Sequence, residues 1–100
     1  MEKNTPHRKL AVFKDLVGRG QVKATATAYR GALDLGFNNL ADMCAVIMSL
    51  KTENFFKSMT TIADHRIWQD VYHANAPDGH VIYLKLTVID DVLIVSFKEL

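Results

Sequence analysis

Polar side chains stand among the apolar and aromatic residues of two segments in the second half of the chain. Lys57 and Gln69 lie in FFKSMTTIADHRIWQDVYH, and Tyr83 and Lys98 lie in VIYLKLTVIDDVLIVSFKEL. These residue types suit metal-free cleavage of a phosphodiester by the RNA's own 2′-hydroxyl, which needs proton transfer at two oxygens and positive charge beside the phosphorane. A tyrosine opposite a lysine could also have a pKa below the usual value of about 10 and exchange protons more readily.

The same residues have an ordinary structural interpretation. Tyr83 and Lys98 could be a cross-strand pair whose ring and stem cover apolar sheet, and on residue types alone this is favoured. His65 and Asp70 raise the same choice, because a histidine suits a general base. Asp64-His65 sits in a turn, however, where an Asp side chain commonly bonds nearby backbone, which favours a structural role.

Other catalytic signatures are absent from the sequence. It contains no P-loop, dinucleotide fingerprint, HExxH, GxSxG or paired-cysteine zinc pattern. The single cysteine, Cys44, has apolar neighbours in MCAVIM, so we expect a small core residue. His73 and His80 could approach each other, but a metal site would need a third ligand that the sequence does not identify. We therefore expect no metal and no cofactor.

Length and composition indicate one globular domain over residues 1–100, because half of the chain is hydrophobic and 23% is charged. No apolar run approaches the roughly 20 residues that cross a bilayer, and the start lacks a signal-peptide core, so we expect a cytoplasmic protein. The net charge is only +1, but residues 1–30 are basic. That third could steer RNA or an acidic protein partner, although a solvated helix face is the simpler interpretation.

Helical spacing of apolar residues predicts three helices in the first half, over 5–18, 26–35 and 39–50, with an extended QVKAT piece after the first. Thr5-Pro6 resembles an N-cap followed by proline at the first helical position. Asn39 with Asp42 resembles a capping box in which Asp replaces Glu.

From Phe55 onward the pattern becomes alternating and predicts four antiparallel strands, near 55–62, 67–73, 80–89 and 92–99. Pro77-Asp78-Gly79 marks one of the turns. Helices first and strands last imply an α+β fold with the N-terminal helices packed on one face of a C-terminal antiparallel sheet. We expect Phe55, Phe56, Trp68 and Tyr72 to pack, and Met43, Met48 and Met59 to fill gaps in the core.

The last hairpin can be assigned a register, because Asp90-Asp91 forms a two-residue loop and Asp tolerates the positive φ that such loops need. One face is then wholly apolar and must meet the helices. The other face carries Tyr83 opposite Lys98, with Lys85 beside them. This polar face is the candidate working surface.

Three segments together carry a family resemblance: FFKSMTTIADHRIWQDVYH, the ending YLKLTVIDDVLIVSFKEL and the opening MEKNTPHRKL. They resemble the MqsR family of bacterial toxins, endoribonucleases of type II toxin–antitoxin systems, over essentially the whole chain. The resemblance implies a RelE-like α+β fold and cleavage of free mRNA at short GC-containing sequences. It also implies inhibition by the zinc- and DNA-binding antitoxin MqsA, through which the toxin would associate with DNA.

Carried over by position, the resemblance implies that Lys57 in KSM, Gln69 in IWQD, Tyr83 in YLK and Lys98 in SFKE are the catalytic residues. The loop ANAPDGH and the Asp90-Asp91 turn depart from the family, which bears on base preference. Two other functions stay open. One is a RelE-like nuclease that cuts only on the ribosome, and the other is a non-catalytic module whose basic N-terminal third binds an antitoxin or a DNA-bound complex.

A shared site also has a geometric consequence. A simple four-residue turn over 63–66 would pair Lys57 with Tyr72 and place Lys57 and Gln69 on opposite faces of the sheet. The resemblance therefore implies an odd connection or a bulge, for example a five-residue loop that places Thr61 opposite Gln69.

Overall fold

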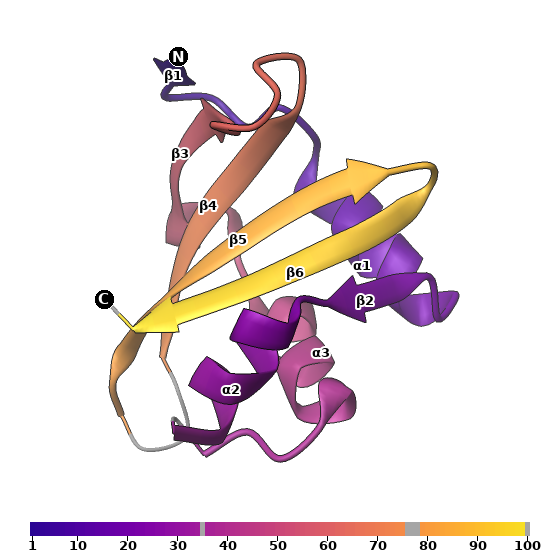
Figure 1. Ribbon diagram of the computed structural model, residues 1–100, viewed down its shortest axis with the longest axis vertical. Coiled ribbons are helices and arrows are strands. Elements are labelled where there is room, and N and C mark those ends of the chain that lie inside the picture. Colours follow the sequence, from indigo (N-terminus) through magenta and orange to yellow (C-terminus); the bar gives the residue numbers. More distant parts are fainter. Residues whose placement is uncertain (35, 76–78, 100) are drawn as a thin grey trace.

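The structure is a computed structural model that describes residues 1–34, 36–75 and 79–99, without the side chains of 98 and 99. Figure 1 shows its elements in chain order. The strands are β1 Glu2–Lys3, β2 Val22–Ala24, β3 Phe55–Thr60, β4 Trp68–Asn75, β5 Val81–Ile89 and β6 Val92–Glu99. The helices are α1 Leu10–Gly18, α2 Ala26–Asp34, α3 Leu40–Ser49 and the short 3-10 helix η1 Thr52–Asn54.

The strands form one six-stranded sheet in the order β1-β3-β4-β5-β6-β2. The predicted four-stranded antiparallel meander is its centre, which confirms the α+β class. Two edge strands from the N-terminal third extend it. The extended QVKAT piece supplies β2, parallel to β6, and the unexpected β1 pairs antiparallel with β3.

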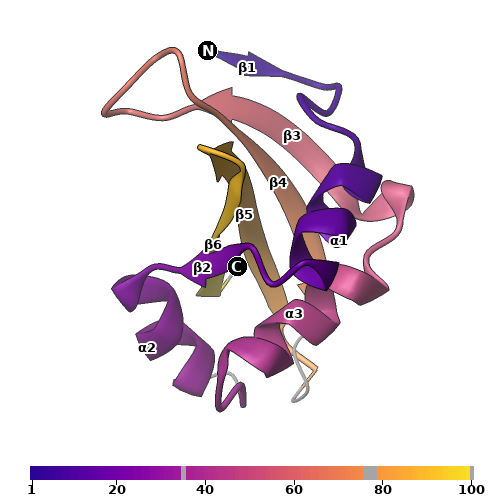
Figure 2. The same cartoon turned by 90° about the vertical axis from the view of Figure 1, so that its right-hand side faces the viewer.

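The hydrophobic core lies between one face of the sheet and the helices. Leu84, Leu86 and Phe97 point into it and are at most 2% exposed, together with Phe13 of α1 and Ile47 of α3. Figure 2 shows α1 and α3 against the curved sheet and α2 beside the edge strand β2. Of the three methionines expected in this core, Met43 is there, Met59 lies on the other face of the sheet, and Met48 is 48% exposed, so those two predictions were wrong. No helix within the described ranges is long and apolar enough to cross a bilayer.

The β5–β6 hairpin has the predicted register, with Leu84 opposite Phe97 and Tyr83 opposite Lys98. Asp90 and Asp91 have φ values of 53° and 62°. Two consecutive positive φ angles are the geometry of a type I′ turn, whose twist matches that of the strands it joins. The other predicted turn lies outside the described residues, because it includes Pro77 and Asp78.

The β3–β4 hairpin confirms the odd connection and also contains a bulge. Lys57 is opposite Val71, Met59 is opposite Gln69, and the register shifts between Phe55 and Lys57. The Thr61 N–H donates to the Ile67 carbonyl, which leaves a five-residue loop over 62–66. Our example paired Gln69 with Thr61, whereas in the structure Gln69 pairs with Met59, two residues earlier on β3. A shift of two residues leaves Gln69 on the same face of the sheet.

The helix limits differ from the prediction at one end. Helix α1 begins at Leu10, with Lys9 at the N-cap and no side-chain cap, so the proposed Thr5-Pro6 cap was wrong. The α3 cap is confirmed, because the Asn39 side chain accepts the Asp42 N–H at 2.9 Å. The expected end of the second helix, Leu35, lies outside the described residues.

The segment before α1, which bends at residues 4–5 and 7–8, is held by Asp70. Asp70 is 1% exposed, and its carboxylate accepts the backbone N–H groups of His7 at 2.9 Å and Arg8 at 3.0 Å. The Ser58 hydroxyl also donates to it. A buried carboxylate that accepts several donors is well satisfied. Asp70 therefore has the structural role that we favoured.

Trp68 holds the same segment from the sheet side. The His7 ring stacks on it with centroids 5.5 Å apart, and Lys3 Nζ lies 4.2 Å from its ring centre. The predictions that Trp68 and Phe55 pack are confirmed, since Phe55 meets Tyr72 edge to face at 5.5 Å.

Candidate active site on the open sheet face

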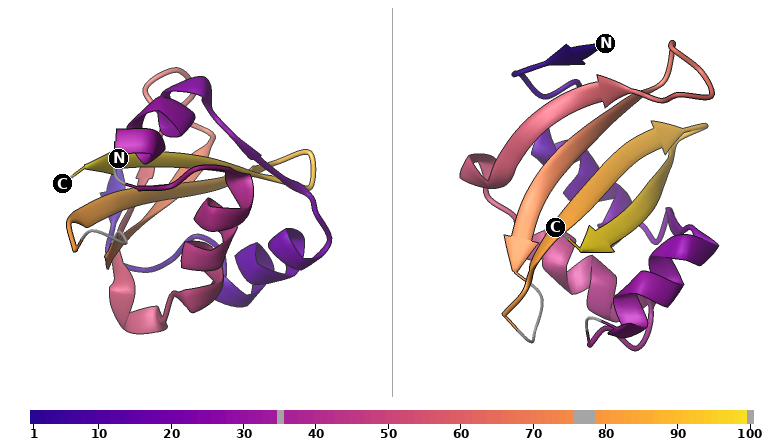
Figure 3. Two further views of the ribbon diagram at one scale, coloured as in Figure 1. Left: turned by 90° about the horizontal axis from the view of Figure 1, so that it is seen from below. Right: turned by 60° about the vertical axis from the view of Figure 1, so that its left-hand side comes forward.

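The sheet face opposite α1 and α3 carries the candidate residues, and we call it the open face. In the right-hand view of Figure 3 the four long strands lie in front of these helices. Alternation and pairing place a defined set of side chains on this face. They are Lys57, Met59, Gln69, Val71, His73, Tyr83, Lys85, Thr87, Ile94 and Ser96.

Two lysines flank a buried floor at the centre of the open face. Val71 is opposite Lys57 on one side and Lys85 on the other, so the three residues form a row across β3, β4 and β5. Val71 is fully buried, although it is not part of the main hydrophobic cluster between the sheet and the helices. Two strand spacings separate the lysine backbones by about 10 Å.

A hollow of about 200 Å³ lies on this row, lined by Lys57, Met59, Tyr83 and Lys85. It is smaller than the roughly 300–1,000 Å³ of sites that enclose small molecules. Two ammonium groups and a phenol around so small a space suit one anionic group, such as a phosphodiester, better than a whole cofactor. A larger cavity of about 600 Å³ lies near Leu10 and Tyr72 and contains none of the predicted catalytic residues.

The bulge in β3 gives the site a second feature. Because the register shifts there, Phe56 and Lys57 both project on the open face instead of alternating. The Phe56 ring stacks on His73 at 4.4 Å and meets Tyr83 edge to face at 5.8 Å. Phe56 thus packs as predicted, but outside the core, and it stays 44% exposed.

Lys57 is held by an acidic side chain from the edge of the sheet. Its Nζ lies 2.6 Å from Glu2 Oε1, with the two side chains 26% and 57% exposed. This hydrogen bond raises the pKa of Lys57 and lowers the pKa of Glu2. Lys57 is therefore a cation at neutral pH and Glu2 a carboxylate.

Gln69 and Lys98 complete the predicted set. Gln69 lies on the open face opposite Met59, one row from Lys57, and its amide has no hydrogen-bond partner among the described residues. Lys98 is opposite Tyr83 in the backbone register, and its side chain lies outside the described residues. The structure thus brings Lys57 and Tyr83 to one hollow. It places Gln69 in the row next to Lys57, on the side away from Tyr83.

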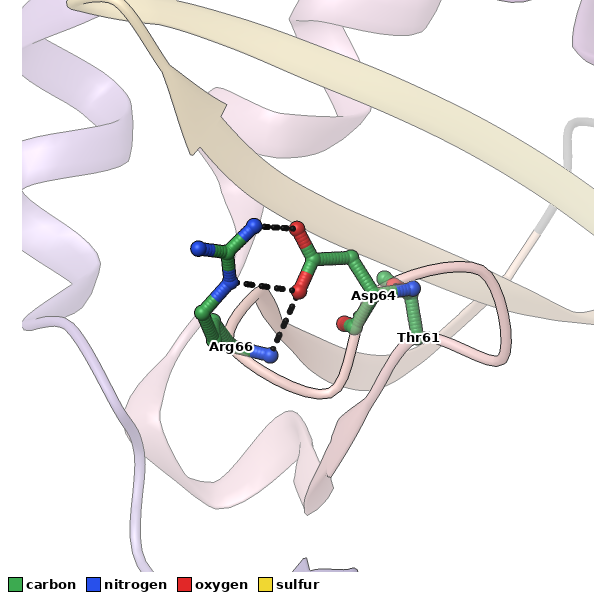
Figure 4. Close-up of polar contacts among 3 residues, drawn as sticks. All are labelled: Thr61, Asp64 and Arg66. Carbon is green, nitrogen blue, oxygen red and sulfur yellow. Dashed lines mark hydrogen bonds and ion pairs between the residues drawn. The ribbon is translucent and has the colours of Figure 1, made fainter.

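His65 does not join this set. It is exposed in the β3–β4 loop, beyond the ends of both strands. Figure 4 shows the loop's own contacts, in which the Asp64 carboxylate accepts the Arg66 backbone N–H at 2.9 Å and binds its guanidinium at 3.1 Å. The structural role expected for Asp64 is confirmed.

The remaining candidates for chemistry lie elsewhere. Cys44 is half-buried in α3, and burial raises the pKa of its thiol, which disfavours the reactive thiolate. Within the described ranges no three His, Cys, Asp or Glu residues form a group that could hold a metal ion.

Sequence reasoning missed Glu2, Phe56 and His73 on the open face. Lys85 was placed there but not among the catalytic residues. Alternation could have indicated His73, four residues from Gln69 on the same strand, but nothing near Glu2 in the sequence indicates that it pairs beside β3. Only the fold brings the chain start to Lys57.

Comparison with known proteins gives the family. A model of the family described as "Motility quorum-sensing regulator, toxin of MqsA" matches residues 5–99. The chain is also 54% identical over 99 residues to the mRNA interferase toxin MqsR of Escherichia coli (strain K12), with 99% of each chain covered. The protein belongs to the MqsR toxin family.

Proposed function

We propose that this protein is a toxin with endoribonuclease activity that cleaves free mRNA at short GC-containing sequences without a metal ion. The observation that carries the proposal is the row of Lys57, Val71 and Lys85 with Tyr83 around one small hollow. The 54% identity to an mRNA interferase supports the substrate class. We propose that residues 1–100 act as one nuclease domain in the cytoplasm, where mRNA is found.

The site residues divide the reaction as follows. The Lys57 and Lys85 ammonium groups hold the scissile phosphate and stabilise the extra negative charge of the phosphorane. The Tyr83 phenol lies within reach of the same group and donates a proton to the leaving 5′-oxygen. Gln69 and Lys98 hold the neighbouring phosphate oxygens or base edges, since an amide and an ammonium both donate hydrogen bonds.

The partner proposed is an antitoxin of the MqsA type, because the matching family is described as the toxin of MqsA. Through such an antitoxin the protein would associate with DNA indirectly. The basic N-terminal third, which we had weighed as a binding surface, is exposed at Lys9, Arg19 and Lys23 and remains available to an acidic partner.

The test is incubation of the purified protein with ribosome-free RNA in EDTA. We expect cleavage at defined sites, with a 2′,3′-cyclic phosphate on one product and a 5′-hydroxyl on the other. Cleavage that appears only when ribosomes are added would replace the proposal with a ribosome-dependent nuclease. RNA or antitoxin binding with no cleavage under either condition would replace it with a binding module.

A further inference from the structure

The N-terminal strand brings a carboxylate onto the open face. Strand β1 pairs with β3 so that Glu2 is opposite Met59, and Met59 is in turn opposite Gln69. Glu2, Met59 and Gln69 therefore form the row next to that of Lys57, Val71 and Lys85. Opposed residues share a face, which places Glu2 on the working side of the sheet and not on the core side.

The position of Glu2 does not depend on its own ion pair. The Met1 carbonyl accepts the Thr60 N–H at 3.0 Å, and the Met1 ammonium donates to Thr60 Oγ1 at 3.2 Å. A few residues on, Asp70 holds the backbone of His7 and Arg8. The strand is thus attached on both sides of Glu2.

Attack by a 2′-hydroxyl needs a group that accepts its proton. Lys57 and Lys85 are donors as ammonium groups, and the Gln69 amide does not accept a proton at neutral pH. His73 Nε2 is buried without a partner in the described structure, and its ring lies against Phe56 and Tyr83. Of the described side chains on the open face, Glu2 is the carboxylate, and it lies 2.6 Å from Lys57 Nζ.

We propose that Glu2 is the catalytic base of this site and accepts the proton of the attacking 2′-hydroxyl while Lys57 holds the adjacent phosphate. The inference rests on the proposed ribonuclease function. A phosphate bound at Lys57 has its ribose beside Glu2, because the two side chains already touch.

The ionisation of the surrounding groups fits this role. The hydrogen bond from Lys57, and to a lesser degree the Met1 ammonium, lowers the pKa of Glu2, so the free protein holds it as a carboxylate at neutral pH. Among the described side chains, Lys57 from β3, Tyr83 and Lys85 from β5 and His73 from β4 are the other titratable groups of this face. When a bound phosphate replaces Glu2 as the partner of the Lys57 ammonium, the hydrogen bond that lowers the pKa of Glu2 weakens. Glu2 then becomes more basic, as the proton transfer requires.

The step balances as follows. The 2′-hydroxyl proton passes to a Glu2 carboxylate oxygen, and the 2′-oxygen forms a bond to phosphorus. The bond from phosphorus to the 5′-oxygen breaks, and that oxygen takes a proton from the Tyr83 phenol. The products are a 2′,3′-cyclic phosphate and a 5′-hydroxyl, and proton exchange with water restores Glu2 and Tyr83.

The test is the Glu2→Gln protein, compared with Glu53→Gln, which removes the same charge at an exposed position on η1. A glutamine oxygen still accepts a hydrogen bond from Lys57 but cannot take up a proton at neutral pH. We expect kcat to fall by roughly 10²- to 10⁴-fold. A 2′-deoxy oligonucleotide that cannot be cleaved should bind Glu2→Gln as tightly as wild type or more tightly, and Glu53→Gln should match wild type in both measurements.

Adding small carboxylic acids to a variant that lacks the Glu2 side chain shows whether Glu2 acts as a base or only orients Lys57. With Glu2→Ala, acetate should restore cleavage better than fluoroacetate, which is similar in size but less basic. A wild-type kcat in Glu2→Gln, with or without a lower KM, would overturn the inference and leave a carboxylate that merely competes with RNA for Lys57. Equal rescue by both acids, or none, would also overturn it. Wild-type protein that fails to cleave RNA would instead overturn the proposed function.

Discussion

The polar residues of the β3–β4 hairpin belong to two opposite faces with different tasks. Lys57 and Gln69 point to the open face, whereas Ser58 and Asp70 point to the other face and bind the N-terminal segment. Alternation along a strand separates the two sets without any break in the sheet. A hairpin that contributes to the core therefore also carries polar side chains that anchor the N-terminal segment and polar side chains that we propose for catalysis.

Replacing Lys57 tests the residue on which the proposed chemistry depends most. We expect Lys57→Ala to lower the rate of RNA cleavage by roughly 10²- to 10³-fold, because the lost ammonium would no longer stabilise the phosphorane. The thermal unfolding midpoint should stay at the wild-type value, because the ion pair with Glu2 is solvent-exposed. Single-turnover kinetics and a thermal melt measure the two quantities.

The matched control is Lys9→Ala, which removes an equal charge from an exposed position at the start of α1. It should cleave RNA at the wild-type rate. A Lys57→Ala protein that cuts as fast as this control would remove Lys57 from the site.

Tyr72 gives a pH dependence of stability. Burial, with the nearby Asp70 charge, raises the pKa of Tyr72 to about 12 from 10.0. The folded protein therefore keeps a phenol proton that the unfolded chain releases near pH 10. Stability from this group is complete below pH 10 and is lost as pH rises from about 10 to about 12. The free energy of unfolding, measured in urea at several pH values, should fall less steeply with rising pH in Tyr72→Phe than in wild type. Equal slopes for the two proteins would contradict a raised pKa of Tyr72.

At the scale of elements, Asp70 determines how the N-terminal segment docks. We expect Asp70→Asn to lower the free energy of unfolding by roughly 1.5–3 kcal/mol, because an amide nitrogen cannot accept the N–H groups that the carboxylate accepts on both oxygens. Urea denaturation measures the loss, and hydrogen exchange should become faster at His7 and Arg8. Unchanged stability and exchange would mean that Asp70 does not hold the segment.

Elements set by local sequence were predictable. The Asp90-Asp91 turn determines the β5–β6 register, because a two-residue loop leaves one pairing. The Asn39 cap marks the start of α3 for a similar local reason. The Thr5-Pro6 cap was not found, because α1 starts only after Lys9 and the distant residue Asp70 holds the backbone of His7 and Arg8 before it.

The site was predictable in part. The family resemblance pointed to Lys57, Gln69 and Tyr83. Because side chains alternate between the two faces of a strand, Lys57 and Gln69 can share a face only if the loop between β3 and β4 has an odd number of residues, as it has in the structure. Glu2 was not predictable, because a two-residue strand shows no periodicity, and its partner Met59 is far away in the chain. Phe56 joins the open face only because the bulge breaks the alternation that sequence reasoning assumes.

At the scale of the whole molecule, the sheet separates the hydrophobic core from the proposed catalytic surface. The helices and the apolar face of the sheet form one hydrophobic cluster, and the predicted catalytic side chains that the structure describes lie on the opposite face. Substitutions of the partly exposed open-face residues Lys57, Gln69 and Lys85 are therefore expected to change activity with little effect on stability. The larger cavity near Leu10, on the helix side, contains none of the residues of the proposed site.

The most direct test of this account is the location of bound RNA. A GC-containing oligonucleotide with a 2′-deoxy residue at the cleaved position should be titrated into labelled protein and followed by NMR. We predict the largest chemical-shift changes at Lys57, Gln69, His73, Tyr83 and Lys85, with little change in α1 and α3. Changes centred on α1 and the basic residues in and beside it, Lys9, Lys14 and Arg19, with the open face unaffected, would contradict the account.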